Sequence, residues 1–160
     1  MNENKETVTI ENYQELAMRT CLPTSKNWDY ATHNYRAELF ELIAKVESYH
    51  AKQIRDGADF DAKKYLEKIA DELGDCYWQL ALLCELGGFD FAKYFANYEN
   101  RLYNQAIYTI GDLNTPNEFA RVAEIRRDFN FDILDILQRN IDKLASRAER
   151  GVIKGSGDNR

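Results

Sequence analysis

Acidic side chains spaced three residues apart are the first feature of this sequence that could do chemistry. On a helix, residues i and i+3 lie side by side, so two carboxylates at this spacing can hold one divalent cation. A random scatter of the 27 acidic residues over 160 positions would give about five such pairs, and the sequence has about that number. The spacing alone therefore identifies no site. The pairs are Glu3/Glu6, Glu38/Glu41, Asp56/Asp59, Glu72/Asp75 and Asp132/Asp135.

Two of these pairs border apolar helix faces in the same way. At ~100° per residue, Tyr, Leu, Val and Ile side chains fill the arc from about 20° to 140° measured from Glu38, with Glu41 at about 300°. The arc measured from Glu72 is filled in the same way, with Asp75 again at about 300°. If the two faces pack together, the four carboxylates meet at the edge of the core.

Carboxylates gathered in a poorly solvated place repel one another unless cations neutralise them. Oxygen ligands favour Mg²⁺, with Mn²⁺ as an alternative, over zinc. Gly74, which lies within the second pair, would let another element or a ligand approach closely. The pattern leaves two alternatives open: the four side chains are solvated flanks of amphipathic helices, or Asp132/Asp135, beside a similar apolar run, is the site instead.

Other chemistries have less support in the sequence. Glu47 and His50 form a single Glu-x-x-His step, whereas a di-iron bundle uses two such steps and two further glutamates. Cys76 and Cys84 lie in apolar surroundings, which raise a thiol pKa, so we expect them to be packing residues. The chain has no glycine-rich phosphate loop of the P-loop or Rossmann type.

Composition limits the class of protein. A chain of 160 residues is expected to form a single domain, and 8 Gly and 2 Pro with 44% hydrophobic residues favour long helices. The net charge of −6 without a basic block argues against a nucleic-acid partner. An odd number of cysteines without CxxC and the absence of a long apolar run predict a reduced cytoplasmic protein without membrane association.

Turn and capping signals divide the chain into helices and predict an all-α fold. Thr115-Pro116-Asn117-Glu118 is the clearest signal, with Thr115 as N-cap and Glu118 closing a capping box. The third helix is expected to be capped by Asp59 or Asp61 and to end at Gly87-Gly88. We expect helices from Thr9 to before Pro23, over about 29–55, 62–86 and 91–110, and from Thr115 with a break near Asn130 before a last stretch.

Three stretches of the chain together resemble the MazG-like branch of the all-α nucleoside triphosphate pyrophosphohydrolases. They are YATHNYRAELFELIAK, the helix containing DELGDCYWQLALL, and the ending NIDKLASRAERGVIKGSGDNR. The resemblance implies a four-helix-bundle-like core in which a Glu-x-x-Glu and a Glu-x-x-Asp hold magnesium. In this sequence these are Glu38, Glu41, Glu72 and Asp75, the pairs that the helical arcs selected.

The resemblance also implies substrate-binding residues and two departures from the family. Leu39 and Phe40 stand between the first two glutamates, where small residues are frequent, and residues 89–129 form a helical insertion. The glycine-rich tail, residues 151–160, is either free or a phosphate-binding loop. Phosphate contacts are expected from Asn140, Lys143, Arg147, Lys45 and Arg160. Lys45 could instead be only a salt-bridge partner of Glu41. Trp28, Tyr77 or Trp78 is expected to stack on the base.

The activity implied by the resemblance is metal-assisted hydrolysis of a nucleoside triphosphate to the monophosphate and pyrophosphate. Glu41 or Glu38 would orient or deprotonate the attacking water. The family commonly closes the site with another subunit, which implies a homodimer or a dimer of dimers. The sequence leaves open a non-catalytic reading, in which the same fold serves as a nucleotide sensor or a protein-interaction module.

Overall fold

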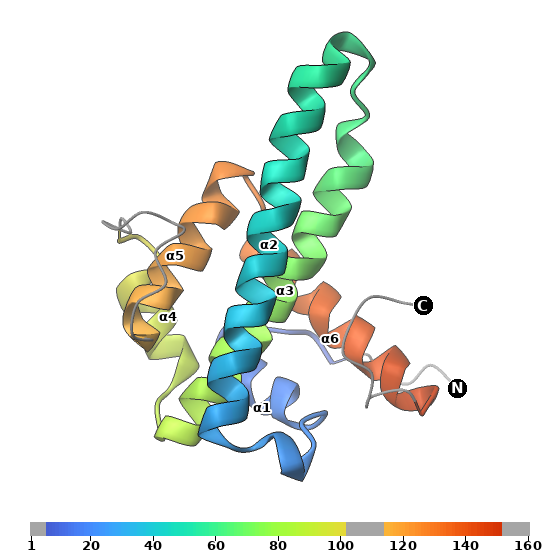
Figure 1. The fold of residues 1–160 in the computed structure, drawn as a ribbon. Coiled ribbons are helices and arrows are strands. Elements are labelled where there is room, and N and C mark those ends of the chain that lie inside the picture. Colours follow the sequence, from blue (N-terminus) through green and yellow to red (C-terminus); the bar gives the residue numbers. More distant parts are fainter. Residues whose placement is uncertain (1–5, 102–113, 152–160) are drawn as a thin grey trace.

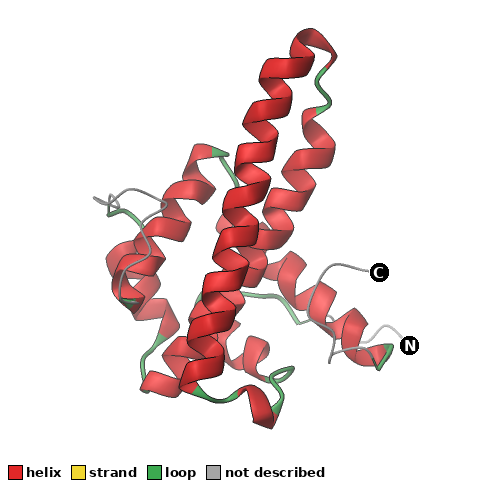
Figure 2. Ribbon diagram, viewed as in Figure 1, coloured by secondary structure: helices red, strands yellow, loops and turns green. Residues whose placement is uncertain are grey.

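The structure is a computed structural model in which residues 6–101 and 114–151 are described, and the regular elements of this part are all helical (Figures 1 and 2). The prediction of an all-α fold is thus confirmed for the described chain. The elements are α1 (Tyr13–Met18), η1 (Pro23–Ser25), α2 (Trp28–Asp56), η2 (Gly57–Asp59), α3 (Ala62–Gly87), α4 (Phe91–Tyr98), α5 (Thr115–Asp128) and α6 (Ile133–Glu149).

The two longest helices, α2 and α3, form an antiparallel hairpin (Figure 1). The Asn27 side chain caps α2 by accepting hydrogen bonds from two backbone N–H groups, and Asp61 caps α3 in the same way with one. Gly57 begins the turn between the helices at φ 54°, a conformation that disfavours a side chain. Local capping and turn signals therefore place the hairpin ends within one residue of the predicted ones.

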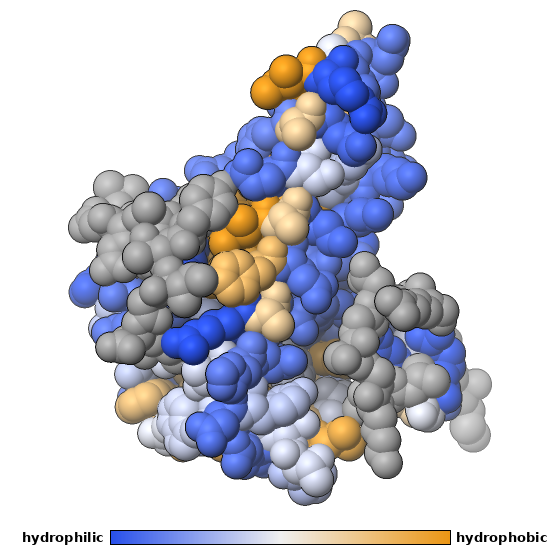
Figure 3. Space-filling view, viewed as in Figure 1, coloured by the Kyte–Doolittle hydropathy of each residue, from blue (hydrophilic) through white to orange (hydrophobic). Residues whose placement is uncertain are grey.

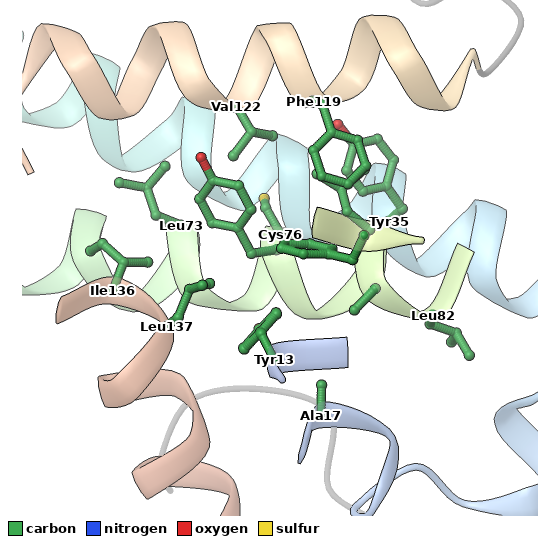
Figure 4. Close-up of a cluster of buried hydrophobic side chains, with 14 of the residues drawn as sticks. Tyr13, Ala17, Tyr35, Leu73, Cys76, Leu82, Phe119, Val122, Ile136 and Leu137 are labelled. Atoms are coloured by element: carbon green, nitrogen blue, oxygen red, sulfur yellow. The ribbon is translucent and has the colours of Figure 1, made fainter. Parts of the chain in front are cut away.

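The core is built around the second half of α3. This part of the helix is apolar on nearly every side, and α1, α2, α5 and α6 all pack against α3. Figure 4 shows side chains from these helices meeting there, with Tyr13 and Ala17 on one side of Cys76 and Phe119 and Val122 on the other. An apolar helix with buried sides needs partners all round, and the helical-bundle packing provides them.

The segment predicted as an insertion, residues 89–129, contributes α4 and α5. Phe91 and Phe95 of α4 are buried, and their rings lie 6.2 Å apart between centroids. Phe119 of α5 packs against Phe91 at 5.1 Å. The predicted helix over 91–110 is shorter than expected, because α4 ends at Tyr98; residues 102–113 lie outside the described residues.

Two predicted helix starts are corrected by the structure. The N-cap of α5 is Asn114, which accepts a hydrogen bond from Asn117 N, so Thr115 is already helical and the predicted capping box does not form. Glu118 instead points inward, because its carboxylate accepts a hydrogen bond from the Tyr35 hydroxyl. Near the N-terminus, Thr9 lies in the preceding turn and α1 begins at Tyr13.

The rival acidic pair, Asp132/Asp135, has a structural role. Asp132 is the N-cap of α6, and its carboxylate accepts hydrogen bonds from Leu134 N and Asp135 N. Asn130, just before it, has a positive φ of 55° and makes the sharp turn between α5 and α6 that the predicted break required. This pair is therefore explained by helix capping.

The surface is mainly hydrophilic in the view of Figure 3, with an apolar band along the front of the α2–α3 hairpin. Exposed large side chains on α2 include Phe40 at 44% and Ile54 at 85%. None of the described helices is long and apolar enough to cross a bilayer.

Candidate metal centre

Three of the four predicted carboxylates come together in the structure. Glu38 of α2 and Glu72 and Asp75 of α3 each offer one oxygen, and these oxygens all lie within 4.8 Å of one another. We call these three residues the acidic cluster. Antiparallel packing of the hairpin brings the two helices' carboxylates to the same level. Glu41 is exposed and lies outside the cluster.

The pKa of Glu38 reports the electrostatics of this cluster. It is raised from 4.5 to about 8, first because burial disfavours the charged carboxylate, and then because Asp75, Glu41 and Glu72 are negative. Lys143 opposes the rise. Burial and negative neighbours therefore disfavour the ionised form of Glu38, and a bound cation would favour it.

Asp75 is held by two side chains from α6. Lys143 Nζ lies 2.6 Å from each of its carboxylate oxygens, and Asn140 Nδ2 donates a hydrogen bond of 3.1 Å to Oδ1. Burial raises the pKa of Asp75, and the charges of Lys143 and Arg147 oppose that rise. Asp75 is thus the point at which the carboxylates of the hairpin meet the cations of α6.

Asn140 lies deeper than Lys45, Lys143 and Arg147, the other predicted phosphate-binding residues that the structure describes. It is 2% exposed, and its Oδ1 accepts a hydrogen bond of 3.0 Å from the Tyr13 hydroxyl. A Cβ built on Gly74 would lie 3.0 Å from Asn140 Cβ, so the missing side chain lets α6 approach α3. The expectation that Gly74 permits a close approach is confirmed. Both ends of the Asn140 amide are used within the protein.

Lys45 and Glu72 form the second cationic contact of the site. Lys45 Nζ lies 3.7 Å from Glu72 Oε1, and the Glu72 side chain is 4% exposed. Lys45 is thus a neighbour of the acidic cluster through Glu72. Lys45 places positive charge beside Glu72, as Lys143 and Arg147 do for Asp75.

The three residues predicted to stack on a base lie in three different environments. Trp28 is 46% exposed in the first turn of α2, about 15 Å along the helix from Glu38 at 1.5 Å per residue. Tyr77 is fully buried, with its ring against α4. The Trp78 indole N–H donates a hydrogen bond to Ala17 O. Trp28 is the one of these three that remains open to a ligand, and Arg160 lies outside the described residues.

The donor set fits the predicted ion. The acidic cluster offers carboxylate oxygens and no nitrogen or sulfur ligand, which is the chemistry of a Mg²⁺ or Mn²⁺ site. Positive side chains beside it could contact the phosphates that such an ion usually binds. The arrangement can therefore bring a divalent cation and a polyphosphate together.

Sequence reasoning missed two buried polar groups. The Tyr13 hydroxyl reaches Asn140 from a helix 127 residues earlier in the chain, a contact for which the sequence has no local signal. Tyr35 donates a hydrogen bond of 2.6 Å to Glu118, whose carboxylate lies 3.4 Å from Arg121 Nε. An acid and a base three residues apart on α5 were visible in the sequence, but their burial was not.

A separate cavity of about 720 Å³ lies between α2 and the end of α5. Its lining includes Ile43, Tyr49, His50, Ile125 and Phe129, and none of the four predicted carboxylates. The Glu47 and His50 side chains border it, which places the single Glu-x-x-His step away from the acidic cluster.

Comparison with known proteins finds one partial relative. The "Gene 37 protein" of Mycobacterium phage L5 is 49% identical over 39 residues. The matching stretch is 24% of this chain and spans about a third (34%) of the phage protein, whose name states no activity. No protein-family model matches the chain, and no solved structure matches it.

Proposed function

We propose that this protein is a Mg²⁺-dependent nucleoside triphosphate pyrophosphohydrolase with a MazG-like core, in which Mn²⁺ can replace Mg²⁺. One observation carries the proposal: the three carboxylates of Glu38, Glu72 and Asp75 meet within 4.8 Å, at the positions where the family resemblance expects metal ligands. The cations of α6 lie directly beside them.

Glu38, Glu72 and Asp75 would hold the metal, with Glu41 near enough to act on Glu38 electrostatically. When bound, a divalent cation supplies Lewis acidity and charge neutralisation for phosphate oxygens. Burial, and then the negative charges of Asp75, Glu41 and Glu72, raise the pKa of Glu38 to about 8, and this supports the assignment because a bound cation favours the ionised carboxylates.

The protein's own residues would bind and orient the polyphosphate. Lys143 and Arg147 on α6, and Lys45 on α2, are placed to offset the charge that develops on the leaving pyrophosphate. Water would attack the α-phosphorus, and the bond to the oxygen that bridges the α and β phosphates would break. The products are a nucleoside monophosphate and pyrophosphate.

A carboxylate must take a proton from the attacking water. Glu38 is one candidate, because its carboxylate belongs to the acidic cluster that would hold the metal. Glu41 is the other candidate, since it is exposed to solvent and belongs to the same helix. Trp28, exposed at the beginning of α2, remains available to stack on a base.

A homodimer or a dimer of dimers belongs to the same proposal. The apolar band on the hairpin in Figure 3 supports it, as do the exposed side chains of Phe40 and Ile54 on α2. Exposed large apolar side chains that share one helix are a frequent feature of subunit contacts.

The test is to incubate the purified protein with ribo- and deoxyribonucleoside triphosphates, with Mg²⁺ or a chelator, and to measure pyrophosphate and monophosphate. We expect Mg²⁺-dependent release of both products, and loss of it in Glu38→Gln and Asp75→Asn. Matched controls are Glu67→Gln and Asp71→Asn, which change α3 residues outside the acidic cluster. Nucleotide binding without any turnover would instead identify a sensor, and neither binding nor turnover would favour an interaction module.

A further inference from the structure

A chain of two hydrogen bonds links α1 to the acidic cluster. The Tyr13 hydroxyl donates to Asn140 Oδ1 at 3.0 Å, and Asn140 Nδ2 donates to Asp75 Oδ1 at 3.1 Å. Tyr13 is fully buried and Asn140 is 2% exposed, so the first bond is shielded from water, whereas the second reaches the partly exposed carboxylate of Asp75. The chain connects three helices that are far apart in the sequence: α1, α6 and α3.

The two bonds together fix the orientation of the Asn140 amide. An amide side chain has one accepting oxygen and one donating nitrogen, and a half-turn exchanges them. An ionised Asp75 carboxylate can only accept, so the NH₂ group is directed to it and the amide oxygen to the Tyr13 hydroxyl, which then donates. The opposite orientation would place the amide oxygen against a carboxylate oxygen, which leaves both acceptors without a donor.

Packing holds both donors in place. Gly74 lets the Asn140 side chain lie directly on α3, since an added Cβ would be 3.0 Å from Asn140 Cβ. The N-terminal segment is tied down at two further points: Val8 N donates to Gln138 Oε1 on α6, and Trp78 Nε1 donates to Ala17 O. The Tyr13 hydroxyl therefore has little freedom to leave Asn140.

We propose that Tyr13 and Asn140 are positioning residues for Asp75, with Tyr13 acting through Asn140. Asn140 directs Asp75 Oδ1 by its hydrogen bond, while Lys143 lies against both Asp75 oxygens and one Asp75 oxygen lies within 4.8 Å of oxygens of Glu38 and Glu72. This inference rests on the proposed function, because it assigns a role toward the metal that the acidic cluster would hold. It makes the N-terminal helix part of the site, although α1 contributes no ligand.

The test uses Tyr13→Phe, which removes the hydroxyl and keeps the buried ring. We expect Mn²⁺ to bind about 10-fold more weakly, as for other losses of a ligand's hydrogen-bonding support. Tyr35→Phe is the matched control, since it also removes a buried hydroxyl that donates to a polar side chain, here Glu118. It should lower thermal stability by a similar amount and change the Mn²⁺ dissociation constant by less than about two-fold.

A double-mutant cycle tests whether Tyr13 acts through Asn140. In the Asn140→Ala background, Tyr13→Phe should weaken Mn²⁺ binding by less than about two-fold, because the connecting amide is already gone. Equal effects of Tyr13→Phe in both backgrounds would overturn the proposed chain. Equal Mn²⁺ affinities of the Tyr13→Phe and wild-type proteins would overturn the positioning role itself.

A measurement without metal separates this inference from the proposed function. In ¹⁵N NMR of the metal-free protein, the Asn140 side-chain NH₂ should exchange slowly with solvent, and Tyr13→Phe should shift its signals and speed its exchange. Unchanged signals would refute the hydrogen-bond chain whatever the metal does. Changed signals in a protein that binds no Mn²⁺ would refute the proposed metal site and, with it, the positioning role.

Discussion

Lys143 Nζ lies 2.6 Å from both carboxylate oxygens of Asp75, so one lysine spans the whole carboxylate. The two side chains are 19% and 24% exposed, and burial by itself would raise the pKa of Asp75. The lysine opposes that effect and keeps a positive charge at the edge of the acidic cluster. A divalent cation entering the cluster and the ammonium group of Lys143 would therefore share Asp75.

Lys143→Met should destabilise the protein, because it leaves the Asp75 carboxylate without its cation. Removing one partner of a partly buried pair is expected to lower the free energy of unfolding by about 1 to 3 kcal/mol. Urea unfolding at pH 7.5 without divalent ions measures this change. Arg139→Gln is the control, since it breaks the more exposed pair with Asp71 and should cost less than about 1 kcal/mol. Equal losses of unfolding free energy in the two variants would contradict the expectation that the Lys143–Asp75 pair stabilises the protein more than the exposed Arg139–Asp71 pair does.

Glu38→Gln should stabilise the metal-free protein at alkaline pH. In the folded protein the pKa of Glu38 is raised from 4.5 to about 8, so the folded state binds this proton more tightly than the unfolded chain does. Wild-type stability must then fall as the pH rises from about 4.5 to about 8. The neutral amide avoids that loss, and we expect a gain of about 2 kcal/mol at pH 8.5 after allowance for solvent screening, and none at pH 4.

Unfolding curves at pH 4, 6 and 8.5 in the presence of a chelator check this prediction. Glu67→Gln, on the exposed side of α3, is the control for the loss of one surface charge. A Glu38→Gln gain that is independent of pH would mean that the carboxylate is not protonated in the folded protein at neutral pH.

Gly74→Ala should separate α6 from α3. The added methyl group would lie 3.0 Å from Asn140 Cβ and 3.2 Å from Asn140 Nδ2, closer than ordinary contact allows. Overpacking of this kind costs typically about 1 to 3 kcal/mol. Thermal unfolding measures the cost, and loss of Mn²⁺ affinity would accompany it because the Asn140 bond to Asp75 is strained. The control is Ala81→Gly, which changes a buried α3 residue away from the cluster.

Mg²⁺ or Mn²⁺ should raise the melting temperature of the wild-type protein. A ligand that binds only the folded state stabilises it by about 2.7 kcal/mol at 100 times its dissociation constant. Asp75→Asn should remove most of this increase, whereas Asp71→Asn should keep it. Differential scanning calorimetry with increasing Mn²⁺ gives the comparison. An equal rise in both variants would indicate binding at surface carboxylates instead of the acidic cluster.

The helix ends and the acidic pairs could be predicted because both depend on neighbouring residues. Asp61 and Gly88 mark the ends of α3 by capping chemistry, and the position of Glu72 relative to the apolar face follows from helical periodicity. Contacts between distant segments had no such signal. Periodicity placed Glu38 at the border of the apolar face and Glu41 further from it, but only the packing of α3 against α2 decided that Glu38 joined the cluster and Glu41 did not.

The roles of Asn140 and Glu118 show the same limit. The resemblance suggested a phosphate contact for Asn140, yet the close approach of α6 at Gly74 buries it beneath Asp75. Glu118 fitted a local capping motif, but its carboxylate is buried and accepts a hydrogen bond from the Tyr35 hydroxyl. The helix is capped by Asn114, one residue before the predicted cap Thr115. In both cases a tertiary hydrogen bond gives the side chain a partner that the sequence did not predict, and for Glu118 it takes the place of the capping box.

The bond between Tyr13 and Asn140 has a consequence for how the site is made on the ribosome. The two residues are 127 positions apart, and α2 and α3 lie between them in the sequence. The carboxylates of α2 and α3 are therefore synthesised before Asn140 and Lys143 of α6. A nascent or truncated chain that stops after α5 holds Glu38, Glu72 and Asp75 without the α6 ammonium and amide groups. Completion of α6 is therefore the step of synthesis that brings positive charge to the carboxylates of the hairpin, and a frameshift before the α6 codons should leave Asp75 without Lys143 and Asn140.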